Sequence, residues 1–212
     1  MTDANRPLAP AMSAGAALDL LAGGNRRLLD AISSAPDPGA ARLEFAKAKP
    51  FAVILGCADS RVPPEIVFDE RPGRLFVVRA GAAVAGPDEI GSVEYAVARW
   101  DCPLVVVLGH TECGAIAASL DPLPPGVDPQ PDPAGWAGLR PLVGSIRAAM
   151  GDTRACYAAP DPWRAAAELH VRRTVALLRE SSEPMRRRVA GGRVEILGAM
   201  FDLRTARVEF LD

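Results

Sequence analysis

The chain lacks the features of several protein classes. No apolar run in its 212 residues approaches the ~18 that a membrane span needs, so we expect no membrane-spanning segment. The net charge is -2, and no basic block stands out apart from Arg186–Arg188. We expect that triplet to be the solvated carboxyl end of a helix, where cations are favourable. Nucleic acid and anionic membranes are therefore not expected as partners.

Cysteine is also scarce. The four cysteines, Cys57, Cys102, Cys113 and Cys156, do not suggest a disulfide framework in a chain of this length. Spaced cysteines in a reducing compartment more often bind metals or act in catalysis. The N-terminus has no basic region followed by an apolar core, so residues 1–12 are predicted to be a flexible leader rather than a signal peptide. A cytoplasmic protein is expected.

Short apolar runs alternate with helical patterns along the chain. Continuous apolar residues predict strands at 51–56, 75–78 and 104–108. Helices are predicted at 13–33, 63–68, 89–100, from 113 onward and at 162–181. Two further strands, 194–201 and 207–211, surround an Asp-Leu-Arg-Thr turn and predict a C-terminal hairpin at the sheet edge. This alternation predicts an α/β fold with a mainly parallel central sheet flanked by helices.

One domain is expected to span residues 1–212. Residues 121–133 carry six prolines and are predicted to form an extended loop. The segment that follows has no separate set of strands with which to build a second sheet. The proline-rich loop is therefore not expected to be a domain boundary.

Three candidate metal ligands follow two of the predicted strands. Cys57 follows the first apolar run, and His110 and Cys113 follow the run at 104–108. Open α/β sheets build their sites at the carboxyl ends of the strands, so these side chains are expected to meet. Two thiolates and an imidazole suit zinc better than magnesium or calcium. Three protein ligands leave a fourth position open for water, which is typical of a catalytic zinc.

Two charged residues follow Cys57 at short spacing. Asp59 can reach the metal or a water bound to it, and Arg61 can hold that carboxylate in a bidentate grip. The pair is predicted to orient Asp59 toward the bound water and to prevent it from ligating the metal. If the pair broke, Asp59 could become a fourth ligand and close the site. Gly109 and Gly114 allow the backbone to approach closely there.

The same residues have simpler interpretations when each is taken alone. Cys57 could be a buried apolar residue, and His110 could be a hydrogen-bonded core histidine. Their combination with the neighbouring charged pair favours the metal. Cys102 and Cys156 are expected to be structural or free thiols. His170, the one other histidine, is expected to pack or hydrogen-bond in its helix rather than shuttle protons.

At these residues the chain resembles the β-class carbonic anhydrases. The similar segments, in that family's order and spacing, are FAVILGCADSRVPPEIVFDERPGRLFVVR, GSVEYAV, PLVVVLGHTECGA and GAMFDLRTARVEF. The resemblance runs from about residue 16 to the C-terminus and is weakest across 121–160.

The resemblance implies a function and an assembly. It implies Cys57, His110 and Cys113 as zinc ligands, with Asp59 and Arg61 as the catalytic dyad. The implied reaction is the hydration of carbon dioxide to bicarbonate by zinc-bound hydroxide. A homodimer or a dimer of dimers is implied, with the N-terminal helix against the partner and the active site near the interface.

The resemblance also implies the substrate pocket. Phe76 and Tyr95 correspond to apolar walls around carbon dioxide, and Gly114 is expected beside the substrate. Two positions depart from the family: Ala48 replaces a glutamine that hydrogen-bonds the substrate, and Ala83 replaces an asparagine. Losing one donor to a developing oxyanion costs ~3 kcal/mol.

These departures leave other functions open. A more apolar pocket could suit carbonyl sulfide, carbon disulfide or a larger metabolite as the small-molecule substrate. A non-catalytic zinc-binding relative is a further alternative. Ile54 stands where some relatives use a tryptophan to bind bicarbonate, so no bicarbonate-driven closure of the site is expected.

Overall fold

A computed structural model of the chain describes residues 12–37, 49–120 and 137–211. The chain divides into two compact units, residues 1–48 and 49–212, and each is described by itself. Ala48, the loop predicted at 121–133 and all but the last residue of the leader predicted at 1–12 lie outside the described residues. The single domain over residues 1–212 stays a prediction.

The first unit contains one described helix, α1, which spans Ala14–Ser33. Ser13 begins the helix, because its hydroxyl oxygen accepts a hydrogen bond from the backbone N–H of Ala16 at 3.2 Å. None of the helix residues is buried, and Leu18 and Leu21 are 65% and 73% exposed. The helix predicted at 13–33 is confirmed, and its apolar side chains are left uncovered by its own unit.

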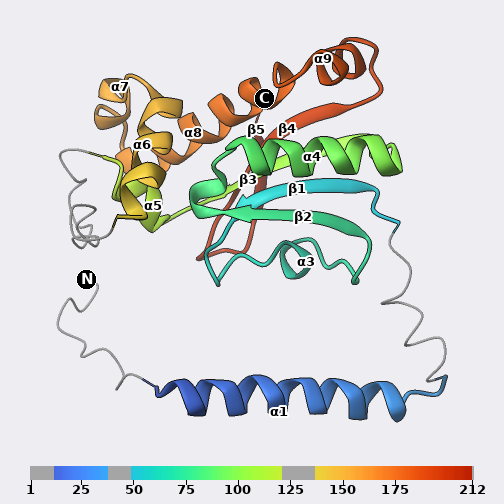
Figure 1. Cartoon of the computed structure of the whole chain (residues 1–212). Coiled ribbons are helices and arrows are strands. Elements are labelled where there is room, and N and C mark those ends of the chain that lie inside the picture. The colour runs from blue at the N-terminus through green and yellow to red at the C-terminus, as the bar shows by residue number, and fades with distance from the viewer. Residues whose placement is uncertain (1–11, 38–48, 121–136, 212) are drawn as a thin grey trace. The chain divides into compact units, whose positions relative to one another are not determined.

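Five strands form the sheet of the second unit. They are β1 (Ala52–Cys57), β2 (Leu75–Ala80), β3 (Leu104–His110), β4 (Glu195–Phe201) and β5 (Val208–Leu211). The order across the sheet is β2-β1-β3-β4-β5. All neighbours are parallel except β4 and β5, which pair antiparallel. The predicted α/β fold, with a mainly parallel sheet and a C-terminal edge hairpin, is confirmed (Figure 1).

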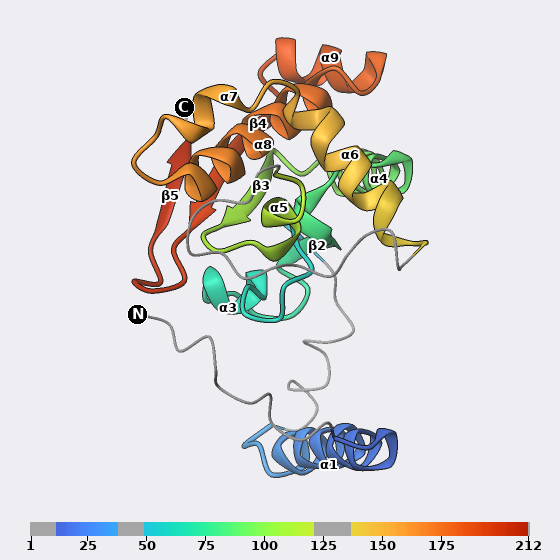
Figure 2. The same ribbon diagram turned by 90° about the vertical axis from the view of Figure 1, so that its left-hand side faces the viewer.

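Helices cover both faces of this sheet. They are α3 (Pro64–Val67), α4 (Pro87–Trp100), α5 (Gly114–Ala117), α6 (Leu139–Met150), α7 (Arg154–Tyr157), α8 (Pro162–Arg179) and α9 (Glu183–Ala190), with a short 3-10 turn, η1 (Gly81–Ala83). Odd-numbered apolar residues of β1 and β3 pack with α4 and α8, and even-numbered apolar residues pack with residues around α3. Figures 1 and 2 show α3 on the opposite face of the sheet from α4 and α8.

One longer helix of this unit was missed by the sequence prediction, and a second was predicted only at its basic carboxyl end. Helix α6 has its buried residues, Val143, Ile146 and Met150, at helical spacing, so its pattern was readable. Helix α9 ends with Arg187 and Arg188 in its last turn, as predicted for the basic triplet. Among the described residues, no helix is long and apolar enough to cross a membrane.

Candidate metal centre

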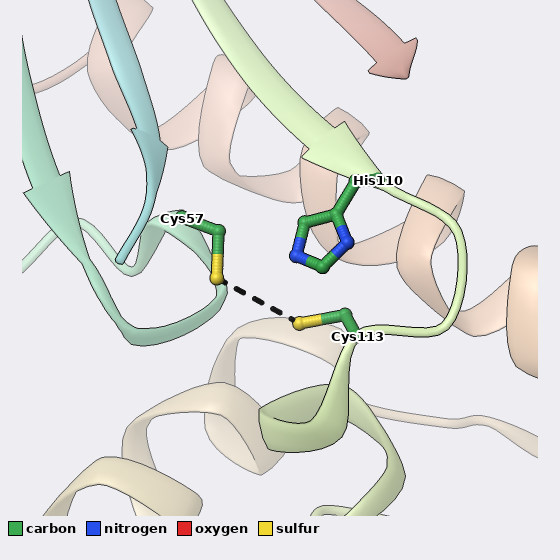
Figure 3. Close-up of side chains that lie close together, drawn as sticks. All are labelled: Cys57, His110 and Cys113. Atoms are coloured by element: carbon green, nitrogen blue, oxygen red, sulfur yellow. Dashed lines mark hydrogen bonds between the residues drawn. The ribbon is translucent and has the colours of Figure 1, made fainter. Parts of the chain in front are cut away.

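Three candidate ligands meet at the carboxyl ends of β1 and β3. Cys57 ends β1, His110 ends β3, and Cys113 lies three residues later, directly before α5. Parallel pairing aligns Gly56 with Leu108, which brings the two strand ends side by side. The ligand atoms of the three residues lie within 4.8 Å of one another, and 3.9 Å separates the two sulfurs (Figure 3). The structure therefore brings together the residues that were expected to meet.

The histidine is oriented as a metal ligand would be. His110 Nδ1 lies 2.8 Å from the carbonyl oxygen of Thr111, and because a carbonyl only accepts, Nδ1 carries the proton. The lone pair is then on Nε2, which is buried and has no hydrogen-bond partner among the described residues. A metal-bound histidine characteristically donates its other ring N–H in this way. Nitrogen with two sulfurs fits a thiophilic divalent cation.

The two thiols differ in acidity. The hydrogen bond with Cys113, helped by His110 and the backbone N–H of Asp59, lowers the pKa of Cys57. The same hydrogen bond, together with burial, raises the pKa of Cys113. The N–H groups of Asp59 and Ala82 donate to Cys57 Sγ at 3.4 and 3.3 Å. Cys57 is therefore the more acidic of the two thiols, and a bound cation would hold both sulfurs as thiolates.

Asp59 and Arg61 form a bidentate ion pair beside this cluster. Arg61 Nε donates to Asp59 Oδ1 at 3.0 Å, and Nη2 donates to Oδ2 at 2.7 Å. These bonds lower the pKa of Asp59 to about 2, so the carboxylate is ionised at neutral pH. Its Oδ2 lies 3.9 Å from His110 Nε2. The carboxylate therefore faces the cluster while its other contacts hold it toward Arg61.

The loop after β3 holds the Arg61 side chain in place. Arg61 Nη2 also donates to the carbonyl oxygen of Glu112 at 3.2 Å. Glu112 has a positive φ of 57°, and its carboxylate pairs with Arg204 at 2.8 Å. These contacts tie the loop after β1 to the loop after β3 and to the C-terminal hairpin.

Two residues that the sequence reasoning missed hold the ligand backbone. Arg79, in β2, donates from Nε to the Cys57 carbonyl at 2.9 Å and from Nη2 to the Asp59 carbonyl. Trp163, in α8, donates from its indole nitrogen to the Cys113 carbonyl at 3.0 Å. A charged residue inside an apolar strand was the available signal for Arg79. Nothing in the local sequence of Trp163 indicates this contact.

A cavity of about 300 Å³ opens beside the cluster. Cys57, Asp59, Cys113 and Gly114 line it on the side of the metal centre. Most of the remaining wall is apolar and comes from α5 and α6, including Leu139, Leu142 and Val143. Gly114 therefore lines this cavity, and its place beside the substrate stays a prediction.

Phe76 and Tyr95 do not line this cavity within the described part of the chain. They form an aromatic cluster with Trp100, with ring centroids of Phe76 and Tyr95 6.3 Å apart. Phe76 pairs with Val53, whereas Cys57 pairs with Ala80. Phe76 thus lies four residues, about 13 Å, before the strand end that carries the site. Their role as pocket walls stays a prediction, and one chain alone does not place them beside the cluster.

Of the two departures from the family, Ala83 lies within the described residues and Ala48 does not; Ile54, the position at which some relatives have a tryptophan, is also described. Ala83 is fully buried in η1, and both Ala82 and Ala83 have left-handed φ angles, 55° and 57°. This conformation costs an alanine ~1–2 kcal/mol, whereas asparagine adopts it more readily. Ile54 is buried on the α3 side of the sheet.

Comparisons with known proteins agree with this geometry. A family model described as carbonic anhydrase matches residues 52–208. Carbonic anhydrase 2 of Mycobacterium tuberculosis (strain CDC 1551 / Oshkosh) is 38% identical over 165 residues, which cover 77% of this chain and 75% of that protein.

Solved structures share the fold. The Coccomyxa β-carbonic anhydrase in complex with acetazolamide is 25% identical, with a TM-score of 0.72 over 92% of this chain and 86% of that chain. A chain from the structures of two tetrameric β-carbonic anhydrases of Sordaria macrospora is 22% identical, with a TM-score of 0.67 over 92% and 95%. The chain therefore belongs to the β-carbonic anhydrase family, zinc lyases that hydrate carbon dioxide.

Proposed function

We propose that Cys57, His110 and Cys113 hold a zinc ion at which the chain hydrates carbon dioxide to bicarbonate, with Asp59 and Arg61 as the catalytic pair. The observation that carries this proposal is the buried cluster of three ligand atoms within 4.8 Å, beside an ionised carboxylate. Zinc held by three histidines lowers the pKa of a bound water to about 7, which supplies a nucleophile at neutral pH. Two thiolates donate more charge than two imidazoles, so a less acidic water is expected here unless Asp59 compensates.

The residues around the ion would set the net charge of the metal centre and the orientation of the attacking water. Two thiolates and a neutral imidazole balance the dipositive ion, and the N–H groups on Cys57 Sγ offset part of the thiolate charge. With zinc bound, the ion would supply the acidity of the attacking water, and Asp59 Oδ2 would be placed to accept a hydrogen bond from that water and orient it toward the substrate. Arg61 keeps Asp59 from moving onto the ion. The apolar cavity wall binds the nonpolar substrate.

Two variants and one matched control test the ligand and dyad roles. Cys57→Ser is expected to lose stoichiometric zinc, whereas Cys102→Ser keeps it, because the Cys102 thiol only donates to the Pro50 carbonyl. Asp59→Asn is expected to keep zinc and lose turnover in stopped-flow hydration. Stoichiometric zinc in Cys57→Ser would contradict the ligand assignment. Full turnover in Asp59→Asn would contradict the catalytic role of the carboxylate.

The cavity favours a second candidate substrate class. Its volume of about 300 Å³ reaches the lower end of pockets that hold drug-sized ligands, roughly 300–1,000 Å³. This space and its apolar lining suit carbonyl sulfide, carbon disulfide or a larger electrophile. A carbonyl sulfide assay beside the hydration assay separates the two. If missing donors limit hydration, Ala48→Gln with Ala83→Asn raises it; activity on neither substrate at full zinc occupancy favours a non-catalytic relative.

We also infer a homodimer or a dimer of dimers in the cytoplasm. The solved Sordaria macrospora relatives are described as tetrameric. Tyr95 is 56% exposed beside Phe76 and Trp100, so a second copy of the chain could cover this aromatic cluster and bring it toward a neighbouring pocket. All four cysteines are free, which supports a reducing compartment. Sedimentation of the zinc-loaded protein tests the assembly, and a monomer at micromolar concentration would contradict it.

A further inference from the structure

His170 is a buried polar residue that the proposed reaction does not use. It lies in α8 and is 1% exposed, and neither of its ring nitrogens has a hydrogen-bond partner among the described residues. A buried polar group without a partner destabilises the folded state. A leucine or phenylalanine would fill the same space without that cost. The histidine therefore calls for an explanation in terms of what its nitrogens face.

The ring faces the metal centre across a small cavity. This space, of about 10 Å³, is lined by Cys57, His110, Cys113 and His170, with Ala82 beside them. Such a volume holds about one water molecule. Asp59 lines the large open cavity, whereas His170 lines the small one, and the two sulfur residues line both. His170 is not one of the residues whose ligand atoms lie within 4.8 Å of one another, so it is not a candidate ligand.

The His170 imidazole can offer one hydrogen-bond donor to the groups around this small cavity. Burial lowers the pKa of His170 to about 4, although the backbone of Ala82 and the nearby Cys57 act in the opposite direction. The imidazole is therefore neutral at pH 7, with one N–H and one lone pair. The polar side chains that line the cavity with it are two cysteines and a histidine whose Nδ1–H is already used. The sulfurs are therefore the side-chain acceptors available to the His170 N–H, beside the backbone of Ala82, which also lines the cavity and raises the pKa of His170.

We propose that His170 is a positioning residue of the metal centre, whose ring N–H donates a hydrogen bond to the Cys57 thiolate when the ion is bound. The inference rests on the proposed function, because it requires a metal-bound thiolate. Cys57 Sγ already receives the N–H groups of Asp59 and Ala82, and His170 adds a side-chain donor from α8. This bond withdraws charge from sulfur and fixes its direction. Removing such an outer partner lowers metal affinity ~10–100-fold.

The test compares four variants in the full chain. His170→Leu and His170→Phe remove both nitrogens, while His170→Asn keeps an amide N–H near the place of Nδ1 and His170→Gln near that of Nε2. Zinc affinity is measured by competition with a chromogenic chelator, and cobalt substitution reports the thiolate-to-metal charge-transfer band. We expect both apolar variants to bind zinc ~10–100-fold more weakly and to shift the band. At least one amide variant is expected to restore both.

Two controls make the outcome decisive. Thr174→Val removes another buried polar side chain one turn along α8 and is expected to leave zinc affinity and the cobalt band unchanged. Wild-type affinity and an unshifted band in a folded apolar variant would overturn the proposal and make His170 a packing residue. Failure of the wild-type chain itself to bind zinc would instead remove the proposed function. Two apolar variants are used so that misfolding of one leaves the comparison intact.

Discussion

Replacing Arg61 by methionine tests whether Asp59 must be held away from the metal. The change removes the bonds from Nε at 3.0 Å and Nη2 at 2.7 Å, and it leaves only the backbone N–H of residue 61, 2.9 Å from Oδ1. Asp59 Oδ2 is already 3.9 Å from His110 Nε2. We therefore expect the released carboxylate to become a ligand of the ion and to displace the water.

The size of the effect follows from the strength of the pair. Hydrogen bonds to charged groups contribute ~1.5–3 kcal/mol each when shielded from solvent. The Arg61 side chain is 49% exposed, and screening reduces the total to about 1–2 kcal/mol. That corresponds to a roughly 5–30-fold shift toward the metal-bound carboxylate. Carbon dioxide hydration should fall by up to this factor, while zinc content stays stoichiometric.

The assay combines stopped-flow hydration with X-ray absorption at the zinc edge. Arg154→Met is the matched control, because Arg154 grips Asp152 with the same pattern of Nε and Nη2 bonds at a fully exposed site. It is expected to change neither activity nor zinc coordination. Wild-type hydration in Arg61→Met would refute the reasoning. An equal loss in Arg154→Met would show that the effect is not specific to the dyad.

Stability measurements give two further predictions. Gly109→Ala should cost ~1–3 kcal/mol, because the added Cβ would lie 2.6 Å from Val171 Cγ2 and 2.8 Å from Met200 Sδ. A Cβ added at Gly144 in α6 meets nothing within 4 Å. Gly144→Ala should therefore stabilise the protein by ~0.5–1 kcal/mol, measured by urea unfolding. Equal effects of Gly109→Ala and Gly144→Ala would contradict the packing argument. Because the pKa of His170 is held at about 4, below 6.5, stability is full above pH 6.5 and falls as the pH drops toward 4. In metal-free protein the free energy of unfolding at pH 5 should be about 2 kcal/mol lower than at pH 7.5. This loss should be absent in His170→Asn. The same dependence of stability on pH in that variant would show that another group titrates.

Local sequence patterns were sufficient for most of the fold. The strands β1 and β3 are continuous apolar runs that are buried on both faces, which is what a parallel sheet requires. The candidate ligands were found because each lies at the end of such a strand or within three residues of it, so their meeting depends mainly on the two strands being neighbours. The ion pair of Asp59 and Arg61 was found because it is local, two residues apart.

The features that could not be predicted depend on register and packing. Phe76 could be placed in a strand, but its distance from the site follows from its pairing with Val53, which no local pattern specifies. Arg79 reaches the ligand backbone from a different strand, 22 residues along the chain. The helical pattern placed His170 in a helix, but what its nitrogens face depends on how α8 packs on β3 and β4.

The ligand cluster also joins two distant parts of the chain. Cys57 and Cys113 are 56 residues apart, and a link that closes a loop of that length removes ~4 kcal/mol of chain entropy from the unfolded state. A cation held by both sulfurs would therefore act as a reversible cross-link between neighbouring strands. Substitutions that weaken metal binding would then lower the stability of the sheet as well as the catalytic activity. Substitutions at the centre are therefore constrained by folding and by reactivity together.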